Sequence, residues 1–243
     1  VHISNTLGCC NPIFEVASLA SSHGALVLLD ACQSLAHQSI DVKALGIDFL
    51  VGSSHKLCGP TGIGFLWAHE DLLRSMPPFL GGGEMIQDVY LDQASWADLP
   101  HKFEAGTPAI GEAIGMGAAL NYLKVIGLES IQAWEKRITE YLFESISRIQ
   151  GLTVYGPSPK AHQNRGPLMT FSVEGLHAND LSVILDTSGI CIRSGHHCCQ
   201  PLHRHLGVTA TARASMSFTT TIQELETFME ELTSSIDFLR SHS

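Results

Sequence analysis

The lysine at position 56 lies among residues that suit covalent chemistry with an aldehyde. It belongs to the segment Ser53-Ser54-His55-Lys56-Leu57-Cys58-Gly59-Pro60, where the apolar run of residues 48–51 gives way to small and polar side chains. Another apolar run, residues 65–68, follows shortly afterwards. A lysine at a sheet edge, beside groups that can hold a phosphate, suits a Schiff base with an aldehyde cofactor. The alternative is a solvated surface lysine.

An acid, Asp30, ends an apolar run upstream of this lysine. Residues 25–29 are apolar throughout, which predicts a fully buried parallel strand. Because ligands of open α/β sheets bind beyond the carboxyl ends of strands, Asp30 and Lys56 would close two successive strands at one edge. Pyridoxal phosphate needs such a pair, and Gln33 could donate a hydrogen bond to its phenolate oxygen. Alternatively, Asp30 is a helix N-cap.

A second candidate site is the segment Arg193-Ser194-Gly195-His196-His197-Cys198-Cys199-Gln200-Pro201. An arginine and two imidazoles beside a thiol favour the thiolate, which is the nucleophilic form. Gly195 and Pro201 predict a mobile loop rather than a helix. One alternative is a plain buried loop. Another is a metal site, although the spacing lacks the regularity of zinc ligands. Its ligands would come from His196, His197, Cys198, Cys199, His203 and His205.

An arginine at position 213 lies in a predicted strand among small and apolar residues. A guanidinium in such surroundings is costly unless it pairs with an anion. Its forked geometry suits the carboxylate of an amino-acid substrate, which is the functional interpretation of Arg213. A structural salt bridge is the alternative.

The apolar pattern along the chain predicts the alternating strands and helices of a doubly wound α/β layer. We expect strands at 1–4, 25–30, 48–53 and 63–68, helices at 12–23 and 32–36, a loop over 77–100, and helices from 108 towards 124 and over 128–149. A smaller domain would add strands at 152–155, 168–173, 190–193 and 212–218, with helices at 178–187 and 222–240. The expected domains are residues 1–150 and 151–243.

Composition narrows the class of protein. The chain has 243 residues, of which 44% are hydrophobic and 16% charged, so it can bury a substantial core. Its net charge of −10 argues against nucleic acid as the main partner, and no apolar run is long enough for a membrane span. The 7 cysteines show no disulfide framework, which favours a reducing compartment. The start at Val1, without methionine or leader, suggests the later part of a longer polypeptide.

Taken together, these segments resemble the class V aminotransferase-like cysteine desulfurases. The chain is most similar to the group II, SufS-type enzymes, and among them to the plastid and cyanobacterial forms. The resemblance covers all 243 residues as the C-terminal part of such an enzyme. It implies the α/β fold of the PLP-dependent transferases, fold type I, with part of the large mixed-sheet domain followed by a small α+β domain. The matching segments are Ser4-Asn5-Thr6-Leu7-Gly8, Asp30-Ala31-Cys32-Gln33, Ser53-Ser54-His55-Lys56, Gly59-Pro60-Thr61-Gly62-Ile63-Gly64, Phe103-Glu104-Ala105-Gly106-Thr107-Pro108 and Arg193-Ser194-Gly195-His196-His197-Cys198.

The resemblance also implies roles for single residues. Lys56 would hold pyridoxal 5'-phosphate covalently, with Asp30 at the ring nitrogen and Gln33 at the phenolate oxygen. The cofactor's phosphate would be reached by Ser53, by His55 and, from the other subunit of a homodimer, by Thr107. The substrate would be faced by Asn5, Arg193 and the carboxylate anchor Arg213. The persulfide would form on Cys198, with Cys199 as its rival.

The activity implied by this resemblance is the conversion of L-cysteine to L-alanine, which leaves a persulfide on the enzyme. A SufE-like acceptor protein would collect the sulfur for iron–sulfur cluster assembly, and L-selenocysteine could enter the same site. The location would be the plastid stroma, or the cytoplasm of a cyanobacterium or other bacterium. Because such enzymes have a preceding part that completes the cofactor site, we expect residues 1–4 and 25–30 to expose apolar faces and this chain alone to bind cofactor poorly. The alternatives are another class V aminotransferase or lyase, or a non-catalytic remnant that binds partners.

Overall fold

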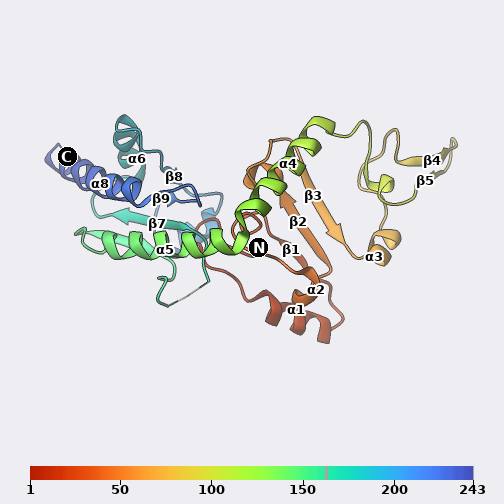
Figure 1. Ribbon diagram of the computed structural model, residues 1–243, viewed down its shortest axis with the longest axis horizontal. Coiled ribbons are helices and arrows are strands. Elements are labelled where there is room, and N and C mark those ends of the chain that lie inside the picture. Colours follow the sequence, from red (N-terminus) through yellow and green to blue (C-terminus); the bar gives the residue numbers. More distant parts are fainter. Residues whose placement is uncertain (162–163, 243) are drawn as a thin grey trace. The chain divides into compact units, whose positions relative to one another are not determined.

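The chain folds as two compact units in the computed structural model, which describes residues 1–161 and 164–242 (Figure 1). Unit 1 comprises residues 1–11, 37–39 and 127–243, and unit 2 comprises residues 12–36 and 40–126. This division differs from the expected boundary at residue 150. The reason is that helix α5 (Leu128–Ile146) buries Ile138, Leu142 and Ile146 in the core of unit 1.

Unit 2 is built on a three-stranded sheet in the order β1-β2-β3, formed by β1 (Leu28–Asp30), β2 (Phe49–Ser53) and β3 (Gly64–Ala68). β1 and β2 run parallel with Asp30 opposite Val51, whereas β2 and β3 run antiparallel. A small core joins α1 to the sheet through Ile13, Leu29 and Leu50. The helices of the unit are α1 (Ile13–Ser22), α2 (Val42–Leu45), α3 (Glu70–Ser75), α4 (Ile110–Ile126) and the 3-10 helices η1 (Ser54–Lys56) and η2 (His101–Phe103).

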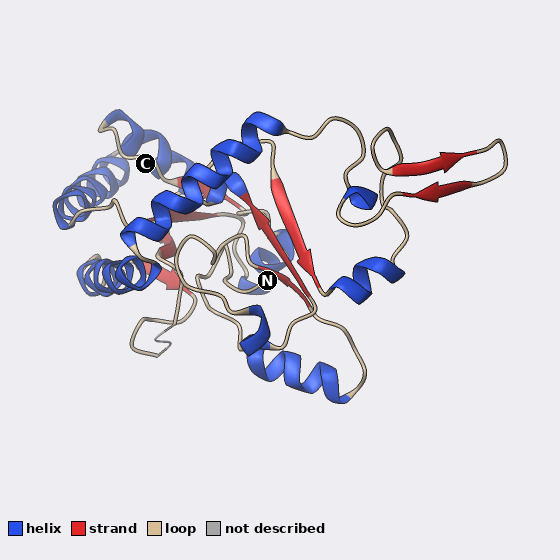
Figure 2. Ribbon diagram, turned by 45° about the vertical axis from the view of Figure 1, so that its right-hand side comes forward, coloured by secondary structure: helices blue, strands red, loops and turns tan. Residues whose placement is uncertain are grey.

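Unit 1 contains a four-stranded sheet in the order β6-β7-β9-β8, in which all neighbouring strands are antiparallel. Its core combines side chains of β7 and β9 with those of α5, α6 and α8. α8 packs against α5 and α6, and Figure 2 shows these helices in blue beside the red strands. The elements, in addition to α5, are β6 (Leu152–Tyr155), β7 (Leu168–Val173), α6 (Ala178–Thr187), β8 (Arg193–Gly195), α7 (Gln200–Leu206), β9 (Thr211–Ser215) and α8 (Ile222–Ser241).

Most of the predicted elements are confirmed, but several are wrong in kind. The strand expected at 1–4 is a single bridge between Ile3 and Cys10. The helix expected at 32–36 is a series of turns, in which the N–H groups of Ser34 and Leu35 both donate to the carbonyl of Ala31. The loop expected over 77–100 contains a hairpin of β4 (Ile86–Val89) and β5 (Ala94–Trp96). Neither glycine nor proline marks the turn of this hairpin, so its sequence lacks the usual signal.

The first strand of unit 2 is shorter than expected and is buried on one face. Leu29 is 1% exposed, whereas Leu26 and Leu28 are 59% and 57% exposed. The prediction of a fully buried strand is therefore wrong, because side chains alternate between the two faces of a strand and here one face is bare. The expected exposed apolar face is present at 25–30. At 1–4 it is limited to Val1, which is 64% exposed, because Ile3 is buried.

Two strands near the candidate thiol are displaced from their predicted positions. β8 begins at Arg193 rather than at residue 190, because Ile190 and Ile192 pack against the core without joining the ladder. β9 ends at Ser215, after which the N–H of Met216 donates to Pro167 outside the strand. Among residues 1–161 and 164–242, no helix combines the length and apolar character needed to cross a membrane.

Candidate active site

The predicted site residues form a group in each unit. Unit 1 holds the thiol group, defined as Asn5, Arg193, Cys198 and Arg213. Unit 2 holds the amine group, defined as Asp30, Gln33, Ser53, His55, Lys56 and Thr107.

Two arginines lie side by side at the centre of the thiol group. The register of β8 and β9 places Arg193 directly opposite Arg213. Burial, followed by the charge of Arg193, lowers the pKa of Arg213, and its Nη1 donates to the carbonyl of Asn5 at 2.7 Å. Within the described part of the chain, the buried Nε of Arg213 has no hydrogen-bond partner and neither arginine forms an ion pair with a carboxylate. Two neighbouring cations without a counter-ion are the local signature of an anion site.

The thiol of Cys198 lies beside this pair of cations. Nη2 of Arg193 donates to its sulfur over 3.4 Å, and the side chain is exposed. Cys198 has a φ of 61° and His197 a φ of 51°, so consecutive non-glycine residues occupy the left-handed region. Such a backbone is uncommon and persists where neighbouring contacts enforce it.

Hydrogen bonds hold the backbone on both sides of Cys198. Nδ2 of Asn5 donates to the carbonyl of His197 at 2.7 Å, and the N–H of Cys199 donates to the carbonyl of His196 at 2.8 Å. The expected loop ends earlier than predicted, because α7 begins at Gln200. Proline in the first turn of a helix loses no hydrogen bond, so Pro201 is compatible with this start.

The segment 195–199, called the thiol loop below, carries two imidazoles that were expected to favour the thiolate. The structure does not give both of them this role. His197 is 1% exposed, and burial lowers its pKa to about 4, with further contributions from the charges of Arg213, His203 and Arg193. Its ring is therefore neutral at neutral pH and supplies no positive charge to a thiolate. His196 lies exposed at the surface. The guanidinium of Arg193 is thus the cation in contact with the sulfur.

Two residues of this region escaped the sequence analysis as parts of the site. His203, considered there only as a metal ligand, and Thr211 are both buried and form hydrogen bonds beneath the loop. The alternation of a strand could have indicated Thr211, since it shares one face of β9 with Arg213. Among residues 1–161 and 164–242, no group of three His, Cys, Asp or Glu side chains is placed to bind a metal ion.

The amine group lies at the carboxyl edge of the sheet in unit 2. Asp30 ends β1, and Lys56 ends η1 immediately after the parallel strand β2. Burial opposes ionisation of Asp30, but hydrogen bonds from Cys32, followed by weaker effects of positive charges that include Lys56, outweigh it, and the pKa of Asp30 is lowered. The carboxylate of Asp30 and the amine of Lys56 thus belong to the ends of two successive parallel strands, at the same edge of the sheet.

A tight turn fixes the segment that carries Lys56. The N–H groups of Leu57 and Gly59 both donate to the carbonyl of Ser54, at 2.8 and 3.0 Å. A Cβ at residue 59 would come within 2.3 Å of the Ser54 hydroxyl, so this position requires glycine. The turn leaves His55 and Lys56 exposed at the sheet edge.

The remaining members of the amine group are placed less closely. Ser53 ends β2 opposite Gly64, and Gln33 is half-buried in the turns after Asp30. Thr107 is exposed in the loop before α4, and no hydrogen bond within the described residues joins it to the others.

The ammonium of Lys56 has no hydrogen-bond or ion-pair partner within residues 1–161 and 164–242. An uncommitted amine near an ionised carboxylate fits the aldehyde and the ring nitrogen of pyridoxal phosphate.

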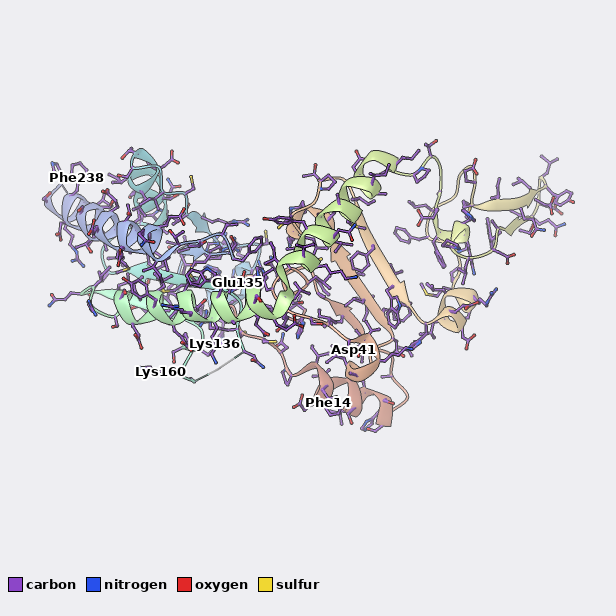
Figure 3. All side chains as sticks on the ribbon, viewed as in Figure 1. Phe14, Asp41, Glu135, Lys136, Lys160 and Phe238 are labelled. Carbon is purple, nitrogen blue, oxygen red and sulfur yellow. The ribbon has the colours of Figure 1, made fainter. Side chains whose placement is uncertain are left out.

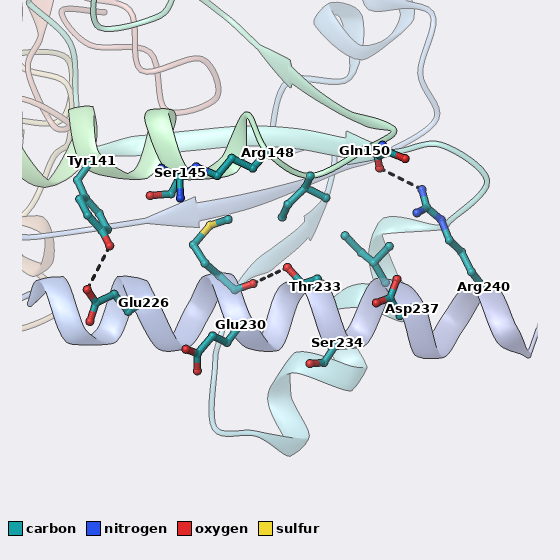
Figure 4. Close-up of a pocket in the computed structure, with 13 residues that line it drawn as sticks. Tyr141, Ser145, Arg148, Gln150, Glu226, Glu230, Thr233, Ser234, Asp237 and Arg240 are labelled. Carbon is teal, nitrogen blue, oxygen red and sulfur yellow. Dashed lines mark hydrogen bonds between the residues drawn. The ribbon is translucent and has the colours of Figure 1, made fainter.

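A groove elsewhere in unit 1 contains none of the predicted site residues. It has a volume of about 710 Å³ and lies between α5 and α8 (Figure 4). Its walls are tied together by a hydrogen bond from Tyr141 to Glu226 at 3.3 Å and one from Arg240 to the carbonyl of Gln150 at 3.2 Å. These polar side chains are thus used within the groove itself.

Comparison with known proteins identifies the family. Residues 1–228 match the model of the aminotransferase class-V family. The chain belongs to this family. A probable cysteine desulfurase from Synechocystis sp. PCC 6803 is 52% identical over 238 residues, which cover 98% of this chain and 56% of that protein.

Solved structures agree with this assignment. The apo structure of a cysteine desulfurase from Thermococcus onnurineus NA1 superimposes with a TM-score of 0.90 at 39% identity, covering 96% of this chain and 58% of that one. The cysteine desulfurase CsdA from Escherichia coli, in an S-sulfonic acid form, gives a TM-score of 0.92 at 33% identity over 98% of this chain and 58% of that one. The predicted α/β fold of type I is confirmed. The chain spans only about half the length of the relatives that it matches.

Proposed function

We propose that this chain provides the sulfur-accepting thiol and part of the cofactor site of a cysteine desulfurase that uses pyridoxal 5'-phosphate. The observation that carries the proposal is the pair of facing arginines with a thiol 3.4 Å from one of them. A cation pair that has no carboxylate partner among the described residues is suited to an anion, and the amino acid cysteine supplies a carboxylate and a sulfur together.

Arg213 is the group that binds the carboxylate of L-cysteine. Its Nη1 is held by the carbonyl of Asn5, which fixes the plane of the guanidinium, while its Nε is buried without a partner among the described residues. A planar fork with free donors recognises a carboxylate through parallel hydrogen bonds. Asn5 thus orients Arg213 through its backbone and the thiol loop through its side chain.

Pyridoxal phosphate would be held by Lys56 at its aldehyde, by Asp30 at its ring nitrogen and by Gln33 at its phenolate oxygen, with Ser53, His55 and a partner copy's Thr107 at the phosphate. When bound, this cofactor draws electrons away from the α-carbon of an amino acid. Asp30 is suited to keep the ring nitrogen protonated because its own carboxylate stays ionised. The amine of Lys56 can carry a proton to and from the substrate carbon.

Cys198 accepts the sulfur of the substrate. Its thiolate forms a bond to the substrate sulfur while the bond between that sulfur and Cβ breaks. The electron pair of the broken bond remains with the carbon, where a proton completes L-alanine. Arg193 lies at the correct distance to stabilise the thiolate before the transfer and the persulfide after it.

Finer features of the proposal follow from the resemblance and from exposure. We assign the chain to the group II, SufS-type enzymes acting as a homodimer, with L-selenocysteine as a second substrate. An exposed Cys198 is accessible to a SufE-like acceptor protein that takes the sulfur to iron–sulfur cluster assembly. The proposed location is the plastid stroma or a bacterial cytoplasm.

The test combines product analysis with mapping of the persulfide. The purified protein is incubated with pyridoxal phosphate and L-cysteine, alanine is measured, and the tryptic peptide 194–204 is examined for an added sulfur. Cys198→Ala should abolish both signals, whereas the matched variant Cys199→Ala should keep them.

Alanine formation that survives Cys198→Ala would reject the proposed chemistry and favour another lyase or an aminotransferase. If the parent protein holds pyridoxal phosphate but gives neither alanine nor persulfide, the proposal is rejected and the non-catalytic alternative is supported.

A further inference from the structure

A continuous chain of hydrogen bonds lies beneath the thiol loop. His197 Nε2 and His203 Nε2 are each 2.9 Å from the hydroxyl of Thr211, and His203 Nδ1 is 3.0 Å from the carbonyl of Cys199. All three side chains are at most 1% exposed. The chain therefore starts at the residue before Cys198 and returns to the residue after it.

The partners of this chain fix the direction of its hydrogen bonds. The carbonyl of Cys199 can only accept, so Nδ1 of His203 carries a proton, and at a pH where this is the ring's only proton Nε2 accepts from the Thr211 hydroxyl. That hydroxyl has one proton, so its oxygen accepts from Nε2–H of His197. His197 is neutral because burial lowers its pKa to about 4. Each ring thus has one defined tautomer.

This chain of hydrogen bonds restricts the backbone on both sides of the Cys198 thiol. Cys198 has a left-handed backbone that only a constrained loop retains. The imidazole of His197 and the carbonyl of Cys199 are held from below, and the carbonyl of His197 is held by Asn5. With both neighbours fixed, the side chain of Cys198 projects towards Arg193. Thr211 connects the two imidazoles and is itself within β9, two residues from Arg213.

We propose that His197, Thr211 and His203 are positioning residues that hold the Cys198 thiol against Arg193 for sulfur transfer. The proposal rests on the proposed function for its purpose, but the geometry that it describes exists without substrate or cofactor. Among the described residues the hydrogen bond to the reacting sulfur comes from Arg193, and His197, Thr211 and His203 act through the backbone on either side of it.

The test measures the reactivity of the thiol in the absence of substrate. Rates of alkylation by iodoacetamide are followed across pH on the tryptic peptide 194–204, in a Cys199→Ala background so that this peptide has a single thiol. Thr211→Val removes the bridging hydroxyl at constant shape, and Thr211→Ser restores it. The control is Thr139→Val, which removes another buried hydroxyl of unit 1 that bonds only within α5.

We expect Thr211→Val to slow alkylation of Cys198 at neutral pH by about fivefold, the effect of one ordinary hydrogen bond, and to move the alkylation midpoint to higher pH. Thr211→Ser and Thr139→Val should match the parent. Where turnover is measurable, kcat should fall in Thr211→Val while KM for L-cysteine stays constant. If Thr211→Val has the parent's alkylation profile, or if Thr139→Val changes it equally, the proposal is wrong.

A measurement on the unmodified protein guards against a variant that fails to fold. Nitrogen-15 NMR of the imidazoles at neutral pH should find the proton of His197 on Nε2 and that of His203 on Nδ1. The opposite tautomer at either ring would overturn the proposal. Both experiments omit cofactor and substrate, so their outcome is separate from that of the desulfurase assay.

Discussion

The thiol group and the amine group are assembled by different means. In unit 1, hydrogen bonds connect Asn5 to His197 and to Arg213, residues separated by 192 and 208 positions. In unit 2, Asp30 and Lys56 come from successive parallel strands and are brought together by strand order alone. The thiol group is therefore sensitive to substitutions far away in the sequence. The amine group depends on the sheet, and the amine of Lys56 is uncommitted within the described part of the chain.

The two units also differ in how completely they bury their large apolar side chains. In unit 1, Phe171, Leu181 and Leu185 are fully buried. In unit 2, Ile114 and Val125 on α4 are 70% and 87% exposed, and Phe14, labelled on α1 in Figure 3, is 61% exposed. Unit 2 thus leaves several large apolar side chains at its surface.

The largest expected effect comes from the uncommitted amine. Lys56→Ala should eliminate the borohydride-trapped cofactor adduct and lower turnover by about a thousandfold, because one amine serves as covalent anchor and proton carrier. The adduct is measured by mass spectrometry of the reduced protein. Lys102→Ala is the control, since Lys102 also lies in unit 2 but bonds to the carbonyl of Arg74 at 2.9 Å. An adduct that persists in Lys56→Ala would show that another amine anchors the cofactor.

The difference between assembly by strand order and assembly by long-range hydrogen bonds explains which site features could be predicted from the sequence. Asp30 and Lys56 were predictable because apolar runs reveal parallel strands, and strand order places their ends at one edge. The left-handed backbone at Cys198 depends on contacts such as the one between Asn5 and the carbonyl of His197. The neutrality of His197 depends on its burial and then on the charge of Arg213. Neither contact leaves a local pattern in the sequence. The one-sided burial of β1 was missed because residues 25–29 are apolar on both faces.

A pH dependence of stability should appear in unit 1. His197 has an ordinary pKa of 6.5 that is lowered to about 4 in the folded chain, first by burial and then by the charges of Arg213, His203 and Arg193. Between these values the unfolded chain binds a proton that the folded chain lacks, so stability is full above pH 6.5 and falls as the pH approaches 4. The loss reaches about 3 kcal/mol.

Urea unfolding of unit 1, followed at pH 7 and at pH 4.5 or so, measures this effect. His197→Gln should flatten the pH dependence, whereas His205→Gln, a change at an exposed position of α7, should preserve it. If the free energy of unfolding falls equally between the two pH values in the parent and in His197→Gln, then His197 is not the group responsible.

Two partly buried arginines of unit 1 differ in role: Arg213 is proposed to bind the substrate, whereas Arg165 stabilises the fold. Arg165 donates to the carbonyls of Pro157, Leu7 and Leu168. Arg213 donates to Asn5 and keeps a free Nε within the described residues. Arg213→Met should raise KM for L-cysteine by about tenfold or more, the loss of a charge-assisted hydrogen bond.

Arg165→Met should instead lower the free energy of unfolding by about 2 kcal/mol, because buried carbonyls lose their donor. Steady-state kinetics and chemical unfolding of both variants separate these outcomes. If Arg165→Met changed KM as strongly as Arg213→Met, the anion site could not be assigned to Arg213.

The smallest expected effect comes from removing the side chain that caps the N-terminus of one helix in each unit. Thr221 caps α8 through the N–H of Glu224 at 3.2 Å, and Asp41, labelled in Figure 3, caps α2 through the N–H of Lys43 at 2.9 Å. α8 buries Leu225, Phe228 and Leu232, whereas α2 buries no side chain. Thr221→Ala should therefore cost about 1 kcal/mol in unit 1, and Asp41→Ala about half as much in unit 2.

Hydrogen exchange of amides in the two units measures these costs separately, and an independent titration checks the first. Hydrogen bonds from the N–H and hydroxyl of Thr221 lower the pKa of Glu224. Removing the hydroxyl in Thr221→Ala should return part of that shift, as followed by carbon-13 NMR of the Glu224 carboxyl. If the pKa rises but exchange in α8 is unchanged, the cap orders only its own turn. The core that α8 shares with α5 and α6 then holds the helix without it.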